Sequence, residues 1–424
     1  MVRVFYSLLF YLLQPLFLLR LLWRSIKAPA YRQRLLERYA LYFKHRLNNK
    51  PTIWVHAVSV GETIAAAPMV RELQRRYPNH SLLVTTTTPT GSDRVHHLFR
   101  GSVEHVYAPY DLPLAQWRFL RRYQPVIAIV METELWPNMV AACHGRGVPV
   151  LLANARLSAK SARGYAKFSR LTRPMLRRLS CVAAQNGTDG QRFLELGLNP
   201  DNLLVSGSIK FDVELDNALR AQAEELRRQW HQNHRLVIIA ASTHAGEDEQ
   251  LLNAVQQLDA SREGVLLVLV PRHPERFEAV ATLVQERGLQ LARRSREESV
   301  QASTEVLLAD TMGEMLLLLG ASDVAFVGGS LIEHGGHNVL EPALWRLPVL
   351  TGPHMYNFQE ITEQLESQGG LKRVTTEVGL LDELRRLSED ECYRVEMGEN
   401  AYRVVKSNRG ALDKLLAVIA KRVA

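Results

Sequence analysis

The chain has 424 residues, of which 46% are hydrophobic, so it is too long for one ordinary domain and apolar enough to bury two cores. Its three cysteines lie far apart, in no CxxC pair and no even-numbered set, which argues against a disulfide framework and favours a reducing compartment. The net charge of +8 is unevenly divided. Residues 1–208 carry 28 Lys and Arg against 11 Asp and Glu, and the remaining residues carry 24 against 33. We therefore expect the first half to meet an anionic partner.

The chain begins with an apolar stretch. Residues 4–19 contain no charge, and Arg20, Arg24 and Lys27 follow directly. A run of about 20 apolar residues spans a bilayer, whereas a shorter one can lie in it. Because no small-residue cleavage site is present and the cations follow the run, we predict that residues 1–30 form an uncleaved anchor with its cations on the cytoplasmic side. The alternative is a hydrophobic helix buried in the protein.

Short apolar runs alternate with amphipathic segments along the rest of the chain, a pattern typical of parallel sheets covered by helices. The predicted strands are residues 52–57, 81–85, 126–130, 148–153 and 181–184 and, after a polar interruption at 212–234, residues 236–240, 265–270, 305–309, 324–327 and 348–350. We predict two doubly wound α/β domains, residues 31–212 and 213–405, and a closing helix within 406–424. Ligands bind at the carboxyl ends of such strands, so two facing domains would place the site in the cleft between them.

Three carboxylates follow predicted strands of the first domain. Glu62 comes after a Ser-Val-Gly turn, where it either stabilises the start of a helix as an anion or takes a proton in the cleft. Glu132 and Glu134 end the third predicted strand, and acidic groups in that place are more often functional than those on a helix face. We expect one of the pair in the cleft and the other as a surface or capping charge.

Residues 156–178 contain eight cations and no acid. Four of them have helical spacing and would form one stripe: Lys160, Arg163, Lys167 and Arg170. Such a stripe is either a solvated face or a surface for anionic lipid. With an apolar anchor nearby and no aromatic-and-basic RNA motif, membrane phosphates suit the basic half better than nucleic acid does. Lys210, in the segment GSIKFD, could face a leaving phosphate, although this signal is weak by itself.

Three strand-end loops in the second half together indicate a nucleotide site. The first contains Arg272 and His273 in a proline-fixed turn, and the second, ADTMGE, places Thr311 and Gly313 at an expected helix start, which suits an anion. The third, GGSLIEHGGHNVLEPA, combines glycines that allow close backbone approach with Glu341, a carboxylate suited to two ribose hydroxyls. None matches GxGxxG or GxxxxGK[ST], which disfavours dinucleotide oxidoreductases and P-loop enzymes.

Metal binding has little support in the sequence. His334 and His337 have no matching Cys or Asp set, and no D-x-D motif occurs. We therefore expect no metal and no cofactor, with phosphate charge offset by helix N-termini and basic side chains.

Taken together, the motifs resemble those of the Kdo (3-deoxy-D-manno-octulosonic acid) transferases of lipopolysaccharide assembly, which are inverting glycosyltransferases of the GT-B type. The resemblance covers essentially the whole chain through HAVSVGE, TTTTPTG, METELWPN, NARLS, GSIKFD, PRHPERF, MGEM and GGSLIEHGGHNVLEPA, in that order. It implies two Rossmann-like domains facing a cleft, with Glu62 as the base and with Glu132 and Lys210 stabilising the transition state. The residues that it implies for binding the donor cytidylate are Arg272, His273, Met312, Gly313, Glu314, Asn338, Val339, Leu340 and Glu341.

The implied reaction transfers Kdo from CMP-Kdo to the tetraacylated lipid A precursor (lipid IVA) at the cytoplasmic face of the inner membrane, without a metal and with two Kdo units as the expected product. The sequence itself leaves open the number of units, the oligomeric state, the source organism and whether the anchor spans the membrane or lies in it. Two other classes remain. One is another GT-B sugar-nucleotide enzyme, such as a UDP-sugar transferase or 2-epimerase. The other is a non-catalytic membrane adaptor, which the charged groups at several strand ends disfavour.

Overall fold

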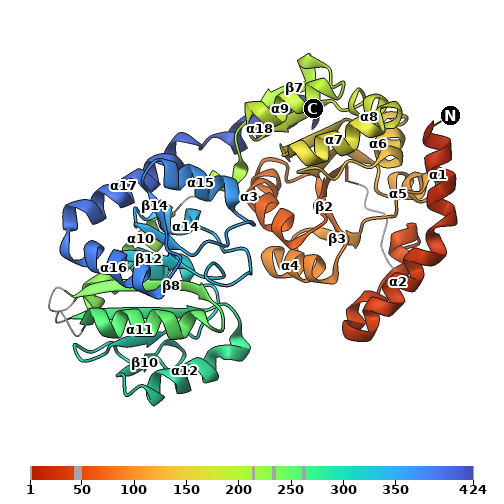
Figure 1. Ribbon diagram of the computed structural model, residues 1–424. Coiled ribbons are helices and arrows are strands. Elements are labelled where there is room, and N and C mark those ends of the chain that lie inside the picture. The colour runs from red at the N-terminus through yellow and green to blue at the C-terminus, as the bar shows by residue number, and fades with distance from the viewer. Residues whose placement is uncertain (1, 43–49, 213–214, 232–234, 260–263, 424) are drawn as a thin grey trace. The chain divides into compact units, whose positions relative to one another are not determined.

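A computed structural model describes residues 2–42, 50–212, 215–231, 235–259 and 264–423. Residue 1, in the expected anchor, and residues 213–214, at the expected start of the second domain, lie outside the described residues. The chain divides into two compact units (Figure 1). The N-terminal unit comprises Met1–Asp212 and Asn408–Ala424, and the C-terminal unit comprises Val213–Ser407.

The N-terminal unit is built on a seven-stranded parallel sheet with the order β3-β2-β1-β4-β5-β6-β7. Its strands are β1 (Thr52–His56), β2 (Ser81–Thr86), β3 (Glu104–Tyr107), β4 (Pro125–Met131), β5 (Val150–Ala155), β6 (Cys181–Ala184) and β7 (Leu203–Val205). The strand order reverses between β1 and β4, so the topological switch point lies there. Both faces are buried: Trp54 packs in one hydrophobic core, whereas Ile53 and Val55 pack in the other.

Helices cover both faces of this sheet. They are α3 (Val60–Arg76), α4 (Pro89–Phe99), α5 (Pro113–Tyr123), α6 (Pro137–His144), α7 (Ala159–Lys167), α8 (Ser169–Leu176), α9 (Gly187–Glu195) and α18 (Ala411–Val423), with short 3-10 turns at Pro29–Arg32, Leu35–Tyr39, Pro200–Asn202 and Ile209–Phe211. The predicted closing helix is confirmed as α18, whose Leu415, Leu416 and Ile419 are buried in the core beside Ile53. Asp212 fixes its start by accepting hydrogen bonds from the N–H groups of Gly410 and Leu412, at 2.6 Å each.

The C-terminal unit holds a second seven-stranded parallel sheet, with the order β10-β11-β9-β8-β12-β13-β14 and its switch point between β8 and β12. The strands are β8 (Leu236–Thr243), β9 (Val265–Pro271), β10 (Leu291–Arg293), β11 (Val306–Leu308), β12 (Val324–Val327), β13 (Val349–Thr351) and β14 (Leu371–Arg373). The helices are α10 (Asn217–Trp230), α11 (Glu247–Asp259), α12 (Phe277–Glu286), α13 (Met315–Gly320), α14 (Leu340–Leu344), α15 (Gln359–Ser367), α16 (Glu377–Glu389) and α17 (Glu391–Ser407), with 3-10 turns at Pro274–Arg276 and Arg294–Arg296. Both units are therefore Rossmann-like α/β folds, as predicted.

All ten predicted strands are confirmed, and the sequence analysis missed β3, β7, β10 and β14. These four are the outermost strands of the two sheets. They are only three or four residues long, and they include exposed or charged positions such as Val205, Glu104 and Lys372. An edge strand is covered on fewer sides than a central one, so its sequence lacks the continuous apolar run that reveals the inner strands.

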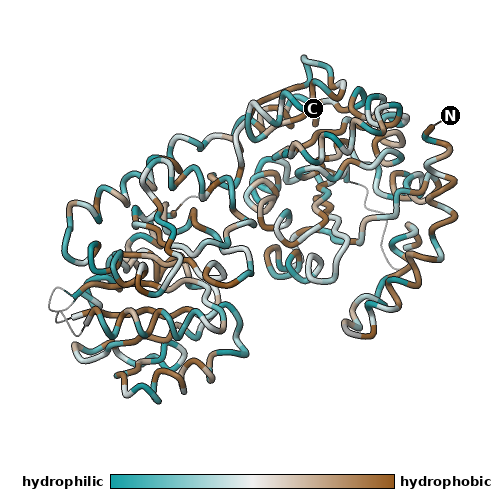
Figure 2. Tube along the Cα trace, in the orientation of Figure 1, coloured by the Kyte–Doolittle hydropathy of each residue, from teal (hydrophilic) through white to brown (hydrophobic). Residues whose placement is uncertain are grey.

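The apolar N-terminus forms two helices, α1 (Val2–Leu12) and α2 (Gln14–Lys27). No single described helix is long and apolar enough to cross a membrane, whereas α1 and α2 together pass that test across a bend of 45°. One side of α1 docks on the N-terminal unit, where the Tyr6 hydroxyl donates to Asp111 and the Ser7 hydroxyl donates to Asn138, at 3.1 Å each. The trace of α1 is mostly hydrophobic, whereas that of α2 alternates with hydrophilic residues (Figure 2). The exposed apolar residues of the two helices include Phe5, Leu8, Leu12, Leu16, Leu19, Trp23 and Ile26, and Arg20 and Arg24 are exposed beside them.

Candidate active site

Glu62 lies at the switch point of the N-terminal sheet, in the first turn of α3. The Glu62 N–H donates to the Ser59 hydroxyl oxygen at 3.2 Å, and that hydroxyl donates to Glu62 Oε1 at 2.8 Å. The Val58 N–H donates to Oε2 at 2.9 Å. This reciprocal arrangement resembles a capping box, so Glu62 stabilises the helix start. Its side chain is also buried, with the residue only 7% exposed.

The surroundings of Glu62 shift its ionisation toward neutral pH. Burial raises the pKa of Glu62 to about 7, the hydrogen bonds from Ser59 and Val58 oppose that rise, and the negative charges of Glu134 and Glu132 add to it. A general base works best when its pKa lies near the working pH. The helix-capping role and the role of base are therefore compatible in this one residue.

Glu132 and Lys210 form an ion pair at the same edge of the sheet. Glu132 directly follows β4 and has a left-handed backbone with φ of 54°. Its Oε1 lies 3.5 Å from Lys210 Nζ, and the side chains are 26% and 28% exposed, respectively. A left-handed conformation is uncommon for glutamate and indicates that the surrounding fold holds it in place. The sequence-predicted Glu62, Glu132 and Lys210 thus lie in one region of the N-terminal unit.

The sequence analysis expected one of Glu132 and Glu134 to be a surface or capping charge. Glu134 is neither of these. It is half-buried, accepts a hydrogen bond from Trp136 Nε1 at 3.2 Å, and burial raises its pKa. Since Glu134 and Glu132 both contribute to the raised pKa of Glu62, both belong to the electrostatic environment of the candidate base.

Asn154 holds the turn that carries Lys210, and the sequence analysis did not single it out. It lies within β5, where the register of the pairing with β6 shifts, is fully buried and has φ of 53°, a conformation that asparagine adopts more readily than most residues. Its Oδ1 accepts hydrogen bonds from the Ser208 hydroxyl and the Ile209 N–H, at 3.2 Å each. An asparagine at a strand end in NARLS is the signal that could have identified it.

The predicted single stripe of cations is wrong, because the helix is interrupted. α7 ends at Lys167, and Phe168 leaves the helical conformation with φ of −110° and ψ of 37°. The Tyr165 carbonyl accepts from the Phe168 N–H and from the Thr172 hydroxyl, which closes the last turn early. The four cations are exposed, but they lie on two helices: Lys160, Arg163 and Lys167 on α7, and Arg170 on α8.

The expected donor residues lie after three strands of the C-terminal sheet. Arg272 and His273 follow β9, and the Arg272 N–H donates to the Thr243 carbonyl at 2.9 Å. Asn338 Oδ1 accepts from the Leu340 N–H at 3.1 Å and so opens α14. Burial raises the pKa of Glu341, whereas the Asn338 side chain and Arg272 lower it, which places Arg272 near the α14 turn.

Val339 and Leu340 are 0% and 1% exposed as whole residues, so neither presents a side chain or backbone atom at the surface. The sequence analysis expected the glycines of the loop after β12 to let a ligand approach. Gly328 has a different role. A Cβ atom there would lie 2.5 Å from the Ser242 carbonyl oxygen, so this glycine permits close packing against the end of β8.

The ADTMGE segment starts its helix later than predicted. α13 begins at Met315, and Glu314 is its N-cap residue. The Glu314 carboxylate pairs with Arg294 at 2.7 Å and accepts from the Thr311 hydroxyl, and these contacts lower its pKa. Met312 is 62% exposed and Gly313 has φ of 92°, so this turn projects from the surface of the unit.

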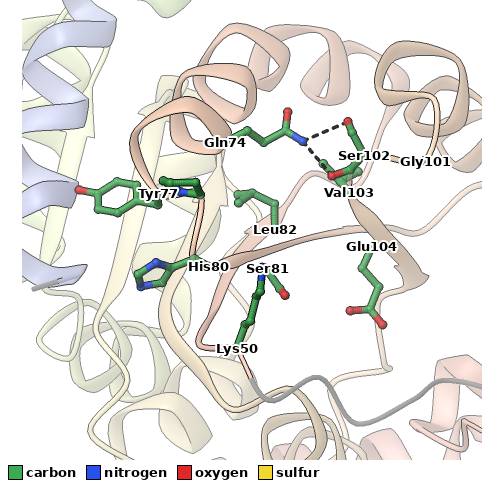
Figure 3. Close-up of a pocket in the computed structure, with 11 residues that line it drawn as sticks. Lys50, Gln74, Tyr77, His80, Ser81, Leu82, Gly101, Ser102, Val103 and Glu104 are labelled. Atoms are coloured by element: carbon green, nitrogen blue, oxygen red, sulfur yellow. Dashed lines mark hydrogen bonds between the residues drawn. The ribbon is translucent and has the colours of Figure 1, made fainter.

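The N-terminal unit also has a hollow of about 740 Å³ (Figure 3), and its lining includes none of Glu62, Glu132 and Lys210. Its lining includes Ser81 and Glu104, the first residues of β2 and β3, and Gln74 Nε2 donates to the Ser102 carbonyl at 2.8 Å beside it. Ligands of doubly wound sheets bind at the carboxyl ends of the strands. Because this hollow lies at the amino ends, we do not assign it to the candidate site.

Two doubly wound parallel sheets, each with polar side chains at its switch point, have the GT-B fold. A glycosyltransferase from Rickettsia africae shares the fold with a TM-score of 0.56 and 14% identity, covering 89% of this chain and 99% of that one. The UDP-GlcNAc 2-epimerase from Neisseria meningitidis has a TM-score of 0.56 and 17% identity, covering 87% and 100%. At such identities the likeness shows the fold alone.

The family itself is shown by sequence. The model of the 3-Deoxy-D-manno-octulosonic-acid transferase (kdotransferase) family matches residues 33–213, and that of Glycosyl transferases group 1 matches residues 243–404. The 3-deoxy-D-manno-octulosonic acid transferase of Haemophilus influenzae is 45% identical over 418 residues, covering 98% of each chain, and that of Bordetella pertussis is 38% identical over 376 residues, covering 86% of each. The chain belongs to the 3-deoxy-D-manno-octulosonic acid transferase family and is a glycosyltransferase, which confirms the resemblance found in its motifs.

Proposed function

We propose that this enzyme transfers Kdo from CMP-Kdo to a lipid A precursor in lipopolysaccharide biosynthesis, with inversion and without a metal ion. Family membership supports the donor sugar and the reaction class. The observation that carries the mechanism is the buried Glu62 at the switch point of the N-terminal sheet, with a pKa of about 7 and the Lys210 and Glu132 pair at the same edge.

Glu62 is the base of the proposed reaction. Its carboxylate takes the proton from the acceptor hydroxyl while that oxygen forms a bond to the anomeric carbon of Kdo. The bond from that carbon to the phosphate oxygen breaks, its electron pair stays on the oxygen, and cytidylate leaves. Proton transfer of this kind contributes about 10²- to 10⁴-fold to the rate. Lys210 supplies positive charge where negative charge develops, and Glu132 holds its ammonium group in place.

The C-terminal unit is proposed to hold the donor cytidylate. Arg272 and the turn from Asn338 to Glu341 offer a cation and a carboxylate at one edge of the sheet. A carboxylate accepts two hydrogen bonds at once, which suits the two hydroxyls of a ribose. His273 and the exposed turn at Met312, Gly313 and Glu314 complete the proposed donor site.

The acceptor is proposed to be the tetraacylated lipid IVA, with two Kdo units added. Mass spectrometry of lipid products after incubation with CMP-Kdo and lipid IVA tests this directly. Products heavier by one and then two Kdo residues are expected, and a chelator should leave the yield unchanged. Turnover with UDP-sugars in place of CMP-Kdo would instead identify another sugar-nucleotide enzyme of the same fold.

We further propose that α1 and α2 attach the enzyme to the cytoplasmic face of the inner membrane by lying in it. The support is the apolar surface of both helices beside a side of α1 that is hydrogen-bonded to the N-terminal unit. An amphipathic helix of this kind buries its apolar face at the boundary of headgroups and acyl chains. The exposed cations on α7 and α8 would then meet lipid phosphates, each contributing about 1 kcal/mol near the surface.

Flotation with anionic vesicles tests this placement. Leu12→Glu with Leu19→Glu, on exposed positions of the helix pair, should release the protein, whereas Leu36→Glu, at a 50% exposed position outside it, should not. Lys160→Glu with Arg163→Glu should weaken binding at low salt and have less effect at high salt, because salt screens surface charges. Unchanged flotation of both double variants would contradict the proposal.

A further inference from the structure

Four histidines gather at the switch point of the C-terminal sheet. His244 directly follows β8, His273 follows β9, and His334 and His337 lie in the loop after β12. β8 pairs with both β9 and β12, so the carboxyl ends of these three strands bring the rings together. The ring centroid of His244 lies 4.5 Å from that of His334, 5.2 Å from that of His337 and 5.3 Å from that of His273.

His244 and His337 form a hydrogen-bonded pair. Their Nε2 atoms lie 2.9 Å apart, and the angle between the ring planes is 1°. One Nε2 must carry a hydrogen and donate while the other accepts, so the neutral pair keeps one Nδ1 atom without a hydrogen. A proton added at that Nδ1 gives the pair a positive charge and leaves the hydrogen bond between the rings intact.

The pair is neutral when no anion is present. Burial is the largest cause of lowered pKa values of about 4 for both His244 and His337. Repulsion from neighbouring basic groups lowers them further, and for the two rings together these groups include His273, His334, Arg272 and Arg276. An opposite charge brought close to such a pair would favour its charged form.

The carboxylates around the histidine cluster interact with groups other than the rings of His244 and His337. Glu247 accepts from backbone N–H groups, Asp248 pairs with Arg276, Glu275 lies near His273, and Glu341 interacts with the Asn338 side chain. Among the described residues, no hydrogen bond joins a carboxylate to the ring of His244 or His337. The charges that face the pair are therefore positive or can become so.

Glu247 occupies the backbone N–H groups that could otherwise bind an anion at this edge of the sheet. It is fully buried in the first turn of α11, and its two oxygens accept from the N–H groups of His244, Gly329, Ser330 and Leu331 at 2.7 to 3.0 Å. The glycine-containing turn after β12 thus directs its N–H groups at the protein's own carboxylate. A ligand at this edge of the sheet would therefore contact the histidine rings and not these backbone N–H groups.

We infer that the His244 and His337 pair, together with Arg272, is an anion site that binds the phosphate or the sugar carboxylate of the nucleotide-sugar donor and takes up one proton as it does so. The inference rests on the proposed function, since the donor supplies the anion. The donor phosphodiester carries one negative charge, whereas the cytidylate that leaves carries more. The added proton therefore lies beside charge that grows as the bond breaks, which stabilises the departing group.

Calorimetry on the full chain with the methyl phosphodiester of CMP tests the inference, because the charge of this probe stays constant near neutral pH. Titrations at about pH 6, in buffers of different ionisation enthalpy, should show uptake approaching one proton per site, because a nearby opposite charge raises such a pKa by about one to three units. The dissociation constant should fall by up to about tenfold for each pH unit between about pH 7 and pH 5. Cytidine, which lacks an anion, should bind without proton uptake.

His337→Asn keeps a polar side chain that cannot be protonated, so its proton uptake should vanish and its pH dependence should flatten. His231→Asn is the matched control, because His231 lies in the same unit but contacts the Ala321 carbonyl at 3.3 Å. Both variants should unfold at temperatures close to that of wild type. Free Kdo separates the two anions: proton uptake with Kdo but not with the CMP ester identifies the sugar carboxylate as the ligand group.

The inference is overturned if wild type takes up no proton with either probe, or if His337→Asn takes up as many as wild type does. A wild-type enzyme that transfers Kdo to lipid but binds without proton uptake would reject this site alone. Failure to transfer Kdo at all would count against the proposed function.

Discussion

The switch points of the two sheets occupy the same place in the fold and carry opposite chemistry. In the N-terminal unit, burial and the negative charges of Glu132 and Glu134 raise the pKa of Glu62 to about 7. In the C-terminal unit, burial and neighbouring basic groups lower the pKa values of His244 and His337 to about 4. Each environment therefore favours the neutral form of the groups at its centre.

The comparison shows that the fold places a functional group at the switch point and that the residues around this group set its ionisation. A carboxyl pushed toward neutral pH becomes a proton acceptor suited to a sugar hydroxyl. Imidazoles pushed to the neutral form become acceptors of a proton when an anion arrives. The first site is thus suited to activating an acceptor and the second to holding a charged donor, and the following predictions, ordered from the largest effect to the smallest, test that division.

Glu62→Gln should have the largest effect. Glutamine keeps the size and one acceptor oxygen, but it cannot take a proton from the acceptor hydroxyl. Turnover should fall by at least about 10²-fold while the affinity for CMP stays within a few-fold. Steady-state kinetics of lipid product formation and calorimetry with CMP measure the two quantities. Near-normal turnover of the folded variant would leave Glu62 as a helix cap only, and Glu132 would become the next candidate base.

Glu341→Ala tests the C-terminal unit and should weaken its binding of CMP. Loss of charged hydrogen bonds to a ribose is worth about 1.5 to 3 kcal/mol, which corresponds to at least about tenfold in the dissociation constant of CMP. Glu333→Ala is the control, because Glu333 is exposed in the same loop. Calorimetry measures both, with and without a chelator. Full CMP affinity of Glu341→Ala, or a requirement for a divalent ion, would contradict the proposed donor site.

Ser59→Ala should sharpen the assignment of the base through the pH profile. The Ser59 hydroxyl donates to Glu62 and lowers its pKa, so its removal should move the acidic limb of the kcat profile to higher pH. Activity should fall by up to about tenfold near pH 6 and much less near pH 8.5. Ser59→Thr keeps the hydroxyl and should restore the wild-type profile.

Thr88→Ala is the matched control for Ser59→Ala. Thr88 is the N-cap of α4, where its side chain accepts from the Gly91 N–H at 3.1 Å with no acidic partner. Both substitutions should cost about 1 kcal/mol of stability through the lost cap. Only Ser59→Ala should shift the profile, and equal shifts in the two variants would show that capping alone is responsible.

The smallest effect concerns stability. Because the folded-state pKa of Glu62 lies above the ordinary value of 4.5, its contribution is present below that value and is lost as pH rises through about 7. Relative to Glu62→Gln, wild type should therefore lose roughly 2 kcal/mol between these limits. Glu72→Gln, on the same helix, should show the opposite sign in a lower range, because Arg75 and Arg76 lower the pKa of Glu72 to about 2 and its contribution is lost as pH falls from 4.5 toward that value. Urea titrations from about pH 3 to pH 8 measure both, and parallel curves for wild type and Glu62→Gln above pH 4.5 would contradict the raised pKa.

The sequence by itself determined the parts of this protein that depend on continuous local patterns. The inner strands of both sheets are rich in apolar residues because they are covered on both faces, so all ten of them could be predicted. The ordered motifs identified the family, and they singled out Glu62 and Glu132 after predicted strands and Lys210 in GSIKFD before any geometry was known.

Tertiary structure decided what depends on distant neighbours. The edge strands form because an inner strand offers hydrogen bonds, and their exposed or charged positions hide the apolar pattern that reveals inner strands of the same length. The Tyr165 carbonyl, shared by Phe168 and Thr172, ends a helix that the spacing of the cations alone predicted to continue. The pairing of His244 with His337 and the hydrogen bonds from the N–H groups of Gly329, Ser330 and Leu331 to Glu247 join segments more than 80 residues apart. Local sequence cannot encode such contacts, because burial and charge act through space and set the pKa values only once the chain has folded.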